Sequence, residues 1–501
     1  MAVETELKFR VPARKLKALL KPRIAGSKGG EPSESDLVST YFDTARHKLK
    51  RHGLTLRVRQ DGGKHVQTVK SARSPRFGRG EWETELHDGN PDPGKARGTP
   101  LDAFASGKLR DKLRPIFETS VRRITVPLQM KRSEIELAID RGRTTAGHRS
   151  RPIQEIELEL KSGQSIDLFR VARALERKSG AELDLRSKAD RGYDLADGEA
   201  HFVASAERIV LDPELTAGEA FRVVARSAFR HFSANADAVR DGEPEGIHQM
   251  RVGLRRLRAA ISLFSKVLIG PGTEEIKTQL KWLTGELAPA RELDVFVKED
   301  IEPALHDALL RRGGKAIREE FSGRRDRAFA RARKAVSSPR YRSLLIDTLQ
   351  WIEAKQTIAA EDEGGPIAKF AAALLHRRIR RLRKDGRHLD RMPAQQRHKV
   401  RIRAKKIRYA VDFFESLFPG KRERKQLARL SKHLKLIQDA LGSLNDFVAH
   451  RKLAVDAALK APHRNERARA FASGVVLGRE EQAVKPLIKI ATREVRGLER
   501  F

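Results

Sequence analysis

The sequence predicts an α+β multidomain protein, in which an antiparallel β domain precedes an all-α domain. Up to about residue 195, short segments of alternating apolar and charged residues are separated by turn-rich stretches, which is typical of antiparallel strands. From Leu215 onward, long stretches rich in Ala, Leu, Arg and Lys follow the helical period. We therefore predict a β domain over residues 1–197, a linker over 198–212 and a helical domain over 213–496.

The length and the charge of the chain limit the possible partners. At 501 residues the chain is too long for one typical domain. Its formal charge is +36, and residues 1–200 hold 41 Lys/Arg against 29 Asp/Glu, whereas residues 201–501 hold 62 against 38. Such a field favours a polyanionic partner, for example nucleic acid, polyphosphate or an anionic membrane surface.

The chain contains no cysteine, which excludes a disulfide framework, a thiolate nucleophile and a Cys-based metal site. Its N-terminus has acidic residues at positions 4 and 6 and no apolar core of signal-peptide length. No run of 18 apolar residues occurs. We therefore expect a cytoplasmic protein without membrane insertion.

The predicted strands carry charged residues at every second position. The first, residues 3–9, places Glu4, Glu6 and Lys8 on one face, and residues 155–161 repeat the pattern with three carboxylates and a lysine. Arg57 and Arg59 alternate in the same way between apolar residues. If these strands share a sheet, one face is a lattice of acids and bases, and a closed sheet would line a charged tunnel.

Such a lattice requires a compensating ligand, because carboxylates and cations about 7 Å apart along a strand are costly to bury. Mg²⁺ prefers carboxylate oxygen ligands, whereas Lys and Arg bind phosphate oxygens. A triphosphate satisfies both sets at once. The alternative is the solvent face of an open sheet, which explains a single Glu-x-Glu-x-Lys well but explains two near-mirror copies less well.

These residues resemble those of a CYTH domain, the triphosphate tunnel metalloenzyme fold. The resemblance covers residues 1 to about 197 and implies an eight-stranded antiparallel tunnel that hydrolyses a triphosphate with Mg²⁺ or Mn²⁺. It is carried by Glu4-x-Glu6-x-Lys8, Tyr41 to Thr44, Leu54 to Arg59, Thr68 to Lys70, Glu155 to Lys161, Ser187-Lys188 and Gly192-Tyr193.

The resemblance also implies roles for individual residues. The metal ligands would be Glu4, Glu6, Glu157 and Glu159, with Glu155 as a nearby acidic contributor. The phosphate-binding cations would be Lys8, Arg57, Arg59, Lys70, Arg123 and Lys188, and two further acidic tunnel positions would be Glu81 and Glu136. A one-residue shift would exchange Arg123 for Arg122. A metal-oriented water would attack the terminal phosphorus, with pyrophosphate as leaving group.

The second half of the chain contains an internal repeat. The pattern at 248–258 recurs at 398–408, 150 residues later, with histidine and basic residues in register, and each copy continues to a phenylalanine. An Ala- or Gly-containing segment follows each copy, at 287–294 and at 441–446. We therefore predict two copies of a helical bundle, over about 213–350 and 365–496.

The repeat places its histidines on a basic helix face. At about 100° per residue, Arg251, Arg255 and Arg258 lie within about 80° of His248, opposite the apolar side. Duplication favours a shared anion site over an incidental surface histidine. Residues 368–408 hold 16 Lys/Arg and 2 Asp/Glu, without a helix-turn-helix pattern, and the chain has only 4 Tyr and 3 Trp. A flexible polyanion without bases therefore fits better than DNA.

This half resembles a CHAD domain over about residues 210–495. The resemblance implies two four-helix bundles and a basic groove that binds inorganic polyphosphate. The matching positions are His248, Arg251, Arg255, Arg258, His398, Arg401, Lys405 and Arg408. The sequence departs from the family at Ala288, where its turn usually has Gly, and at Glu292, where it usually has Asp. These departures affect the expected loop that holds Arg291, and its counterpart at Asn445, but not the basic stripe.

Together the two halves indicate an inorganic triphosphatase whose tunnel cleaves short polyphosphates and whose helical half binds longer ones. Association with polyphosphate granules would follow from that binding. Two other classes fit the sequence. One is a non-catalytic binder of polyphosphate or nucleic acid, and the other is a triphosphatase or cyclase acting on thiamine triphosphate, nucleoside triphosphates or ATP.

Overall fold

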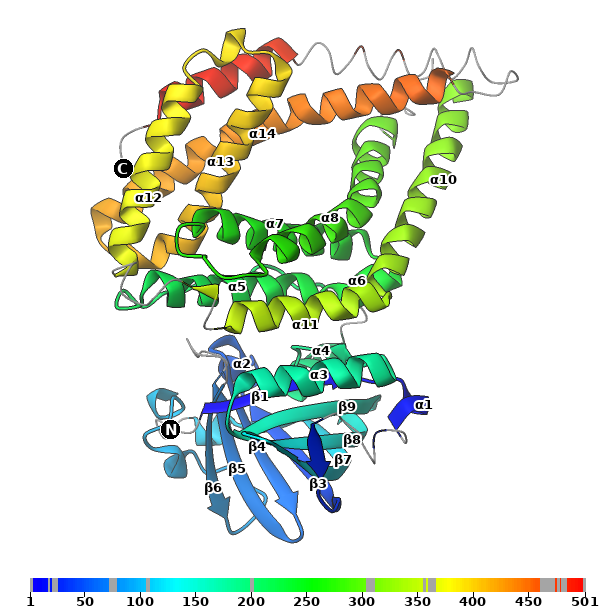
Figure 1. The fold of residues 1–501 in the computed structure, drawn as a ribbon, viewed down its shortest axis with the longest axis vertical. Helices are drawn as coiled ribbons and strands as arrows, with labels where there is room; N and C mark the ends of the chain where they lie inside the picture. Colours follow the sequence, from blue (N-terminus) through cyan, green and yellow to red (C-terminus); the bar gives the residue numbers. More distant parts are fainter. Residues whose placement is uncertain are drawn as a thin grey trace. The chain divides into compact units, whose positions relative to one another are not determined.

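A computed structural model describes most of the chain, which divides into two compact units (Figure 1). The first unit is Met1–Val203 with Ser337–Ala354, and the second is Ala204–Val336 with Lys355–Phe501. The described residues are 3–16, 19, 26–71, 79–104, 109–198, 202–302, 311–354, 357–358, 366–459, 474, 478 and 484–498. Among the helices of this described part, none has the length and apolar character needed to cross a membrane.

The first unit is built on an antiparallel sheet, in which β1, β6, β5, β4, β3, β7, β8 and β9 pair in this order. Because β1 also pairs with β9, these eight strands close into a ring. The short β2 adds to β7, and β10 adds to β1. The strands are β1 (Val3–Arg10), β2 (Ser27–Gly29), β3 (Ser33–Asp43), β4 (Leu54–Asp61), β5 (Lys64–Ser71), β6 (Arg79–Leu86), β7 (Arg114–Met130), β8 (Glu134–Ala146), β9 (Arg149–Ser162) and β10 (Glu182–Leu183).

The alternation of these strands separates two faces. Leu7 and Phe9 of β1 and Ile156 and Leu158 of β9 are buried on the outer face. Helix α3 (Ser165–Ser179) covers them with its own apolar stripe, in which Leu168, Val171 and Leu175 follow helical spacing. The charged residues between them consequently point into the ring. Shorter elements of this unit are α1 (Ala13–Leu16), α2 (Lys48–Arg51), α4 (Lys188–Asp197) and single turns at Pro93–Ala96, Asp102–Phe104 and Arg110–Lys112.

Asp43 joins two of these short helices. Its carboxylate accepts hydrogen bonds from the backbone N–H groups of Leu49 and Lys50 in α2 and from the Tyr193 hydroxyl of α4, the last at 2.9 Å. Beside this contact, Gly192 lets the Phe117 ring approach the α4 backbone. The two sequence motifs that contain Asp43 and Tyr193 therefore meet in one structural contact, although they are 150 residues apart.

Helix α11 (Pro339–Glu353) groups with the first unit, although it lies within residues 213–496, the predicted helical domain. It begins with a Ser338 cap and packs on α3. Arg342 Nε donates to Glu176 Oε1 at 3.1 Å, and Arg173 donates to Gln350 Oε1 at 2.8 Å. These polar contacts hold α11 against the helix that covers β1 and β9.

The second unit is helical, which confirms the predicted change from strands to helices and with it the α+β fold class. Its helices are α5 (Ala217–Ser233), α6 (Ala236–Asp241), α7 (Pro244–Leu263), α8 (Thr273–Phe296) with a π turn (Val297–Ile301), α10 (Arg311–Val336), α12 (Ile367–Asp385), α13 (Ala394–Phe414), α14 (Lys421–Leu459), single turns at Leu389–Arg391 and Glu415–Leu417, and a helical segment within 484–498.

The sequence repeat forms α7 and α13, which contact each other. The phenylalanines that end the two copies, Phe264 and Phe414, meet in the core with ring centroids 5.8 Å apart, and Phe264 also stacks on Phe370 of α12. The expectation of a loop at 287–294 is wrong, because this segment lies inside α8. Buried Leu287, Ala290 and Leu293 follow helical spacing there and continue the helix.

Gly192→Ala should destabilise the first unit, since its Cβ would lie 2.1 Å from Phe117 Cε2. Overpacking of this kind costs about 1–3 kcal/mol. The matched control is Gly285→Ala in α8, where a Cβ meets nothing within 4 Å and helix propensity improves by about 1 kcal/mol. Calorimetric unfolding should show a lower midpoint temperature for Gly192→Ala and no decrease for Gly285→Ala. An unchanged midpoint for Gly192→Ala would contradict the packing described.

Candidate functional site

The inner face of the strand ring carries a row of three glutamates. Glu6 of β1 lies directly opposite Glu159 of β9, which lies opposite Glu136 of β8. Like charges in opposite cross-strand positions repel each other, so this row requires nearby cations. Lys161 Nζ lies 2.7 Å from Glu159 Oε2 and 3.7 Å from Glu136 Oε2, and Lys8 Nζ lies 3.3 Å from Glu6 Oε1. Neighbouring strands thus present carboxylates and lysines side by side.

A second acidic group lies deeper in the ring and consists of Asp140, Glu155 and Glu157. One oxygen from each lies within 4.8 Å of the others, a spacing that could hold a metal ion. Asp140 is not among the residues predicted from the sequence. The sequence does indicate its position, because Asp140 continues the two-residue alternation of Glu134 and Glu136 along β8, with Ala138 between Glu136 and Asp140.

Glu157 is the centre of an ion-pair network. Its Oε1 lies 2.6 Å from Lys8 Nζ and 3.0 Å from Lys188 Nζ, and its Oε2 accepts a hydrogen bond from Arg123. Burial alone would raise the pKa of Glu157, but Lys188, Lys8 and Arg123 lower it well below its ordinary value. Glu157 therefore stays ionised and joins β1, β7, β9 and α4.

Lys188 contacts all three carboxylates of the deeper group. Its Nζ lies 2.6 Å from Asp140 Oδ2 and also contacts Glu155 and Glu157. Burial opposes protonation, but these carboxylates raise the pKa of Lys188 above its ordinary value. Lys188 is the first residue of α4, directly after the Ser187 cap, so the helix start fixes its position. Because Lys188 contacts Asp140, Glu155 and Glu157 together, it holds these three carboxylates in place.

The register of β7 decides between two neighbouring arginines. Arg123 lies opposite Asp140 on the inner face and binds its carboxylate in a bidentate manner, with both nitrogen–oxygen distances 2.7 Å. Arg122 points outward, contacts Glu34 and is 66% exposed. The predicted residue is therefore the one that lies in the ring.

The opposite wall of the ring carries the cations Arg57, Arg59 and Lys70 on β4 and β5, beside Glu81 of β6. Glu81 Oε2 lies 2.9 Å from Lys70 Nζ, and Glu81 Oε1 lies 3.4 Å from Arg57. Arg59 is half-buried and forms no hydrogen bond or ion pair through its side chain with the described residues. Burial, Arg57 and Arg123 lower the pKa of Arg59. An anion in the ring would thus find an arginine that has no carboxylate partner there.

Most of the predicted tunnel residues share the inner face, as the cross-strand register shows. The side chain of Glu4 lies outside the described residues, although its backbone pairs with β6. The residues that the ring and α4 bring to this face are Glu6, Lys8, Arg57, Arg59, Lys70, Glu81, Arg123, Glu136, Glu155, Glu157, Glu159 and Lys188.

The helical unit contains a basic cluster, which we define as Arg251 and Arg255 of α7 with Arg401 and Lys405 of α13. Arg255 Nε donates to the hydroxyl of Tyr409 on α13 at 3.3 Å. Burial, Arg401 and Arg255 lower the pKa of Lys405 to about 8, and burial and Arg255 lower the pKa of Arg251 to about 10. Both repeat copies thus contribute cations to one partly buried group.

The two predicted histidines differ in burial and in their contacts. His248 is half-buried, and burial and Arg291 lower its pKa. His398 is exposed, and its Nδ1 lies 2.8 Å from Asn445 Oδ1 of α14.

The last two predicted arginines lie near other basic residues. Arg408 is near Lys405, whereas Arg258 is near Lys406, whose Nζ donates to Ser262 Oγ at 2.9 Å. The predicted stripe on α7 therefore divides between two neighbouring groups.

Glu157→Gln should destabilise the protein by about 3 kcal/mol at neutral pH, because it leaves buried cations without their shared carboxylate. Since the pKa of Glu157 is lowered in the folded protein, its contribution is present above pH 4.5 and is lost as the pH falls below it. The variant should therefore lose less stability on acidification than the parent. Chemical unfolding between neutral and acidic pH measures both effects.

The control for this experiment is Glu34→Gln, which removes an exposed carboxylate paired with Arg122 on the outer face. Exposed pairs contribute about 0–1 kcal/mol. Equal effects of the two substitutions would contradict the central place given to Glu157.

Comparison with known proteins identifies both halves. The CYTH domain model matches residues 2–193, and the CHAD domain model matches residues 223–455. The inorganic triphosphatase of Haemophilus influenzae is 34% identical over 162 residues, which make up 31% of this chain and lie in its CYTH part. The chain spans 45% of that relative's length.

A solved structure resembles the helical half. The crystal structure of the CHAD domain from the plant Ricinus communis is 27% identical with a TM-score of 0.53, and the match covers 60% of this chain and 99% of that domain. The order of the two domain matches agrees with the order of β and α parts along the sequence. The chain therefore carries a CYTH domain followed by a CHAD domain.

Proposed function

We propose that the CYTH ring hydrolyses inorganic triphosphate to pyrophosphate and phosphate with the help of Mg²⁺ or Mn²⁺. The relative in Haemophilus influenzae that matches this part is named an inorganic triphosphatase. The observation that carries the proposal is Arg59, a half-buried cation in the ring without a carboxylate partner among the described residues. With Arg57 and Lys70 beside it on the same wall, it offers binding positions for several phosphate oxygens.

The row of Glu6, Glu159 and Glu136 is the best place for the metal ion. Carboxylate oxygens are the ligands that Mg²⁺ and Mn²⁺ prefer, and neighbouring strands supply three of them. Glu4 is the next residue of the same parity on β1 and belongs to the same proposed set. The deeper group of Asp140, Glu155 and Glu157 could also hold a cation, but Lys188 and Arg123 already contact its oxygens.

The residues of the ring would have different roles in phosphoryl transfer. A bound divalent cation would neutralise phosphate oxygens and orient the attacking water. Arg57, Arg59 and Lys70 hold the triphosphate and stabilise the charge that spreads over the transferred group. Lys8 lies between Glu6 and Glu157 and contacts both carboxylates, and it helps to keep Glu157 ionised. No covalent nucleophile is required, because water attacks the terminal phosphorus in line with the leaving pyrophosphate.

For the CHAD domain we propose binding of inorganic polyphosphate at the basic cluster of α7 and α13. Four cations meet there, and Asp446 is an acidic group that acts on Arg401 and Lys405 from α14. Burial lowers the pKa values of Arg251, Arg401 and Lys405, and a bound anion would replace the hydration that these cations have lost. Polyphosphate supplies closely spaced negative charges and needs no aromatic residue to stack a base.

Glu6→Gln should lower the rate of phosphate release from triphosphate by about a hundredfold or more, since it removes a proposed metal ligand. Glu34→Gln on the outer face is the matched control and should leave the rate unchanged. The assay compares triphosphate, ATP and thiamine triphosphate with Mg²⁺ or Mn²⁺, and triphosphate should be preferred. Full activity of Glu6→Gln would refute the assigned site.

The affinity of the CHAD domain for polyphosphate should fall as the pH rises through about 8, because Lys405 then loses its proton. Loss of one charged hydrogen bond corresponds to about tenfold in affinity. Lys405→Arg keeps the charge and should flatten this pH profile. Lys425→Arg, at an exposed position of α14, should leave the profile unchanged. Titration calorimetry of the full chain with a metal chelator measures the effect, and a pH profile unaltered by Lys405→Arg would contradict it.

A further inference from the structure

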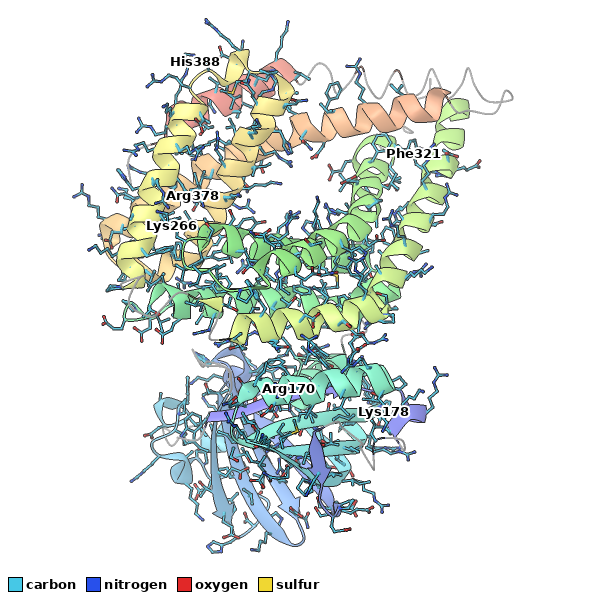
Figure 2. All side chains as sticks on the ribbon, in the orientation of Figure 1. Arg170, Lys178, Lys266, Phe321, Arg378 and His388 are labelled. Carbon is cyan, nitrogen blue, oxygen red and sulfur yellow. The ribbon has the colours of Figure 1, made fainter. Side chains whose placement is uncertain are left out.

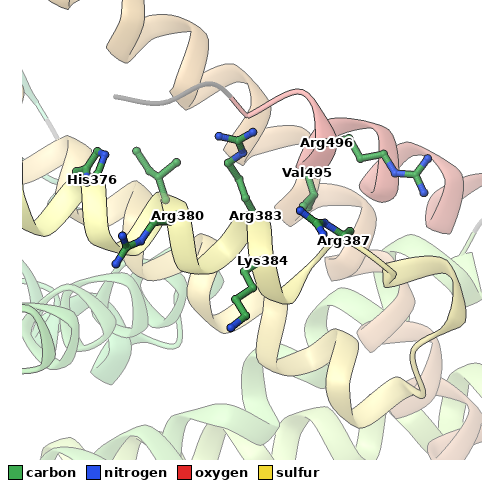
Figure 3. A pocket seen from close by; sticks show the side chains of 8 residues that line it. His376, Arg380, Arg383, Lys384, Arg387, Val495 and Arg496 are labelled. Atoms are coloured by element: carbon green, nitrogen blue, oxygen red, sulfur yellow. The ribbon is translucent and has the colours of Figure 1, made fainter.

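A cavity of about 570 Å³ lies in the second unit, between α12 and the helical segment within 484–498 (Figure 3). Neither the tunnel nor the basic cluster of α7 and α13 includes any of its residues. Figure 3 shows that the side chains come from α12, from the turn after it and from the C-terminal helical segment. The lining residues are His376, Ile379, Arg380, Arg383, Lys384, Arg387, Val495 and Arg496.

A stripe of basic residues on one side of α12 lines the cavity. His376, Arg380 and Arg383 are separated by four and three residues, a spacing that places them in one row along α12, and Arg387 follows in the turn after the helix. The helix ends at Asp385, and Gly386 follows. A Cβ at Gly386 would lie 2.6 Å from Val495 Cγ1, so glycine allows the turn to approach the C-terminal segment closely. That approach adds Arg496 to the row.

The charge of this cavity is not balanced by protein carboxylates. The lining has no Asp or Glu, and its five Lys and Arg residues form no ion pair within the described part of the chain. The two nearby acids are engaged elsewhere. Asp385 contacts Arg381 and Arg403, whereas Glu494 contacts His433 and Arg493.

The cavity lies on a different side of α12 from the core of the domain. Arg378, labelled in Figure 2, follows His376 by two residues and therefore lies about 200° around the helix from it. Its Nη2 donates to the Ser262 carbonyl of α7 at 3.2 Å. The residues of α12 that face α7 are thus on the opposite side from the basic row. The cavity and the cluster of α7 and α13 are separate sites.

The chemistry of the lining selects one class of ligand. Small-molecule sites commonly measure about 300–1,000 Å³, so the volume suits a compact molecule or a short segment of a chain. Arginine binds phosphate oxygens in pairs, and four arginines are present. The lining has no Phe, Tyr or Trp to stack a base. We propose that this cavity is a second anion site, which binds a base-free anion carrying several adjacent phosphate groups.

The absence of cysteine from the chain allows a site-specific test, because one introduced cysteine is then unique. His376→Cys places a thiol in the cavity, and Arg422→Cys places one on the exposed, basic start of α14. The rate of labelling by an uncharged maleimide is measured with a metal chelator and with inorganic polyphosphate, inositol hexakisphosphate or duplex DNA. Neither position is placed in the tunnel, so the test does not depend on hydrolysis.

We expect polyphosphate or inositol hexakisphosphate to slow labelling of His376→Cys at least about tenfold and to leave Arg422→Cys unaffected. Protection by inositol hexakisphosphate alone would identify the ligand as a compact free molecule. Protection by both inositol hexakisphosphate and polyphosphate would show that the cavity also accepts a segment of a polyphosphate chain. Either result supports the proposal. No protection, equal protection at both positions, or protection by DNA alone would overturn it.

A second pair of variants tests the arginines directly. Arg383→Gln/Arg387→Gln removes two cavity cations, and Arg422→Gln/Arg424→Gln removes two exposed cations with the same change in net charge. Affinity for whichever anion protects the cavity should fall at least about tenfold in the first variant only. Thermal unfolding checks that both variants fold. Equal affinity of the two variants would overturn the proposal.

Discussion

The CYTH domain depends on one buried carboxylate that several cations share. Glu157 of β9 receives Lys8 from β1, Arg123 from β7 and Lys188 from α4. Removing any single partner would leave charge behind in a poorly solvated place, so the strands and the helix must stay together. The hydrogen-bonded ring closes through β1 and β9, and Glu157 ties the same two strands through their side chains. Backbone pairing and ion pairing thus specify the same closure.

The inner face carries charges of both signs on each side of the ring. Lys8 and Lys188 lie among the carboxylates, and Glu81 lies beside Arg57 and Lys70. The carboxylates of β1, β8 and β9 lie beside one another, and Arg57, Arg59 and Lys70 lie on β4 and β5. The substrate proposed for this ring, a triphosphate with a divalent cation, also carries charges of both signs. The buried network joins β1, β7, β8 and β9 to α4, because each of its cations contacts at least two carboxylates.

The sequence predicted the inner face well, because side chains of a strand alternate strictly and the charged positions of β1 and β9 kept that period. Arg123 could not be separated from Arg122 without the register of β7. Asp140 was missed because Ala138 interrupts the run of acids before it. The loop expected at 287–294 was wrong, since burial of Leu287 and Leu293 outweighs the turn expected there. The cavity beside α12 required a second segment more than 100 residues away.

The meeting of Phe264 with Phe414 has a consequence for the kind of polymer that suits the CHAD domain. Two copies of one pattern, joined at equivalent residues, present similar cations from both sides of their contact. A nucleic acid strand has distinct 5′ and 3′ directions, whereas linear polyphosphate is the same molecule when it is turned end for end. The polyphosphate binding proposed for this cluster would therefore not depend on the direction in which the chain lies.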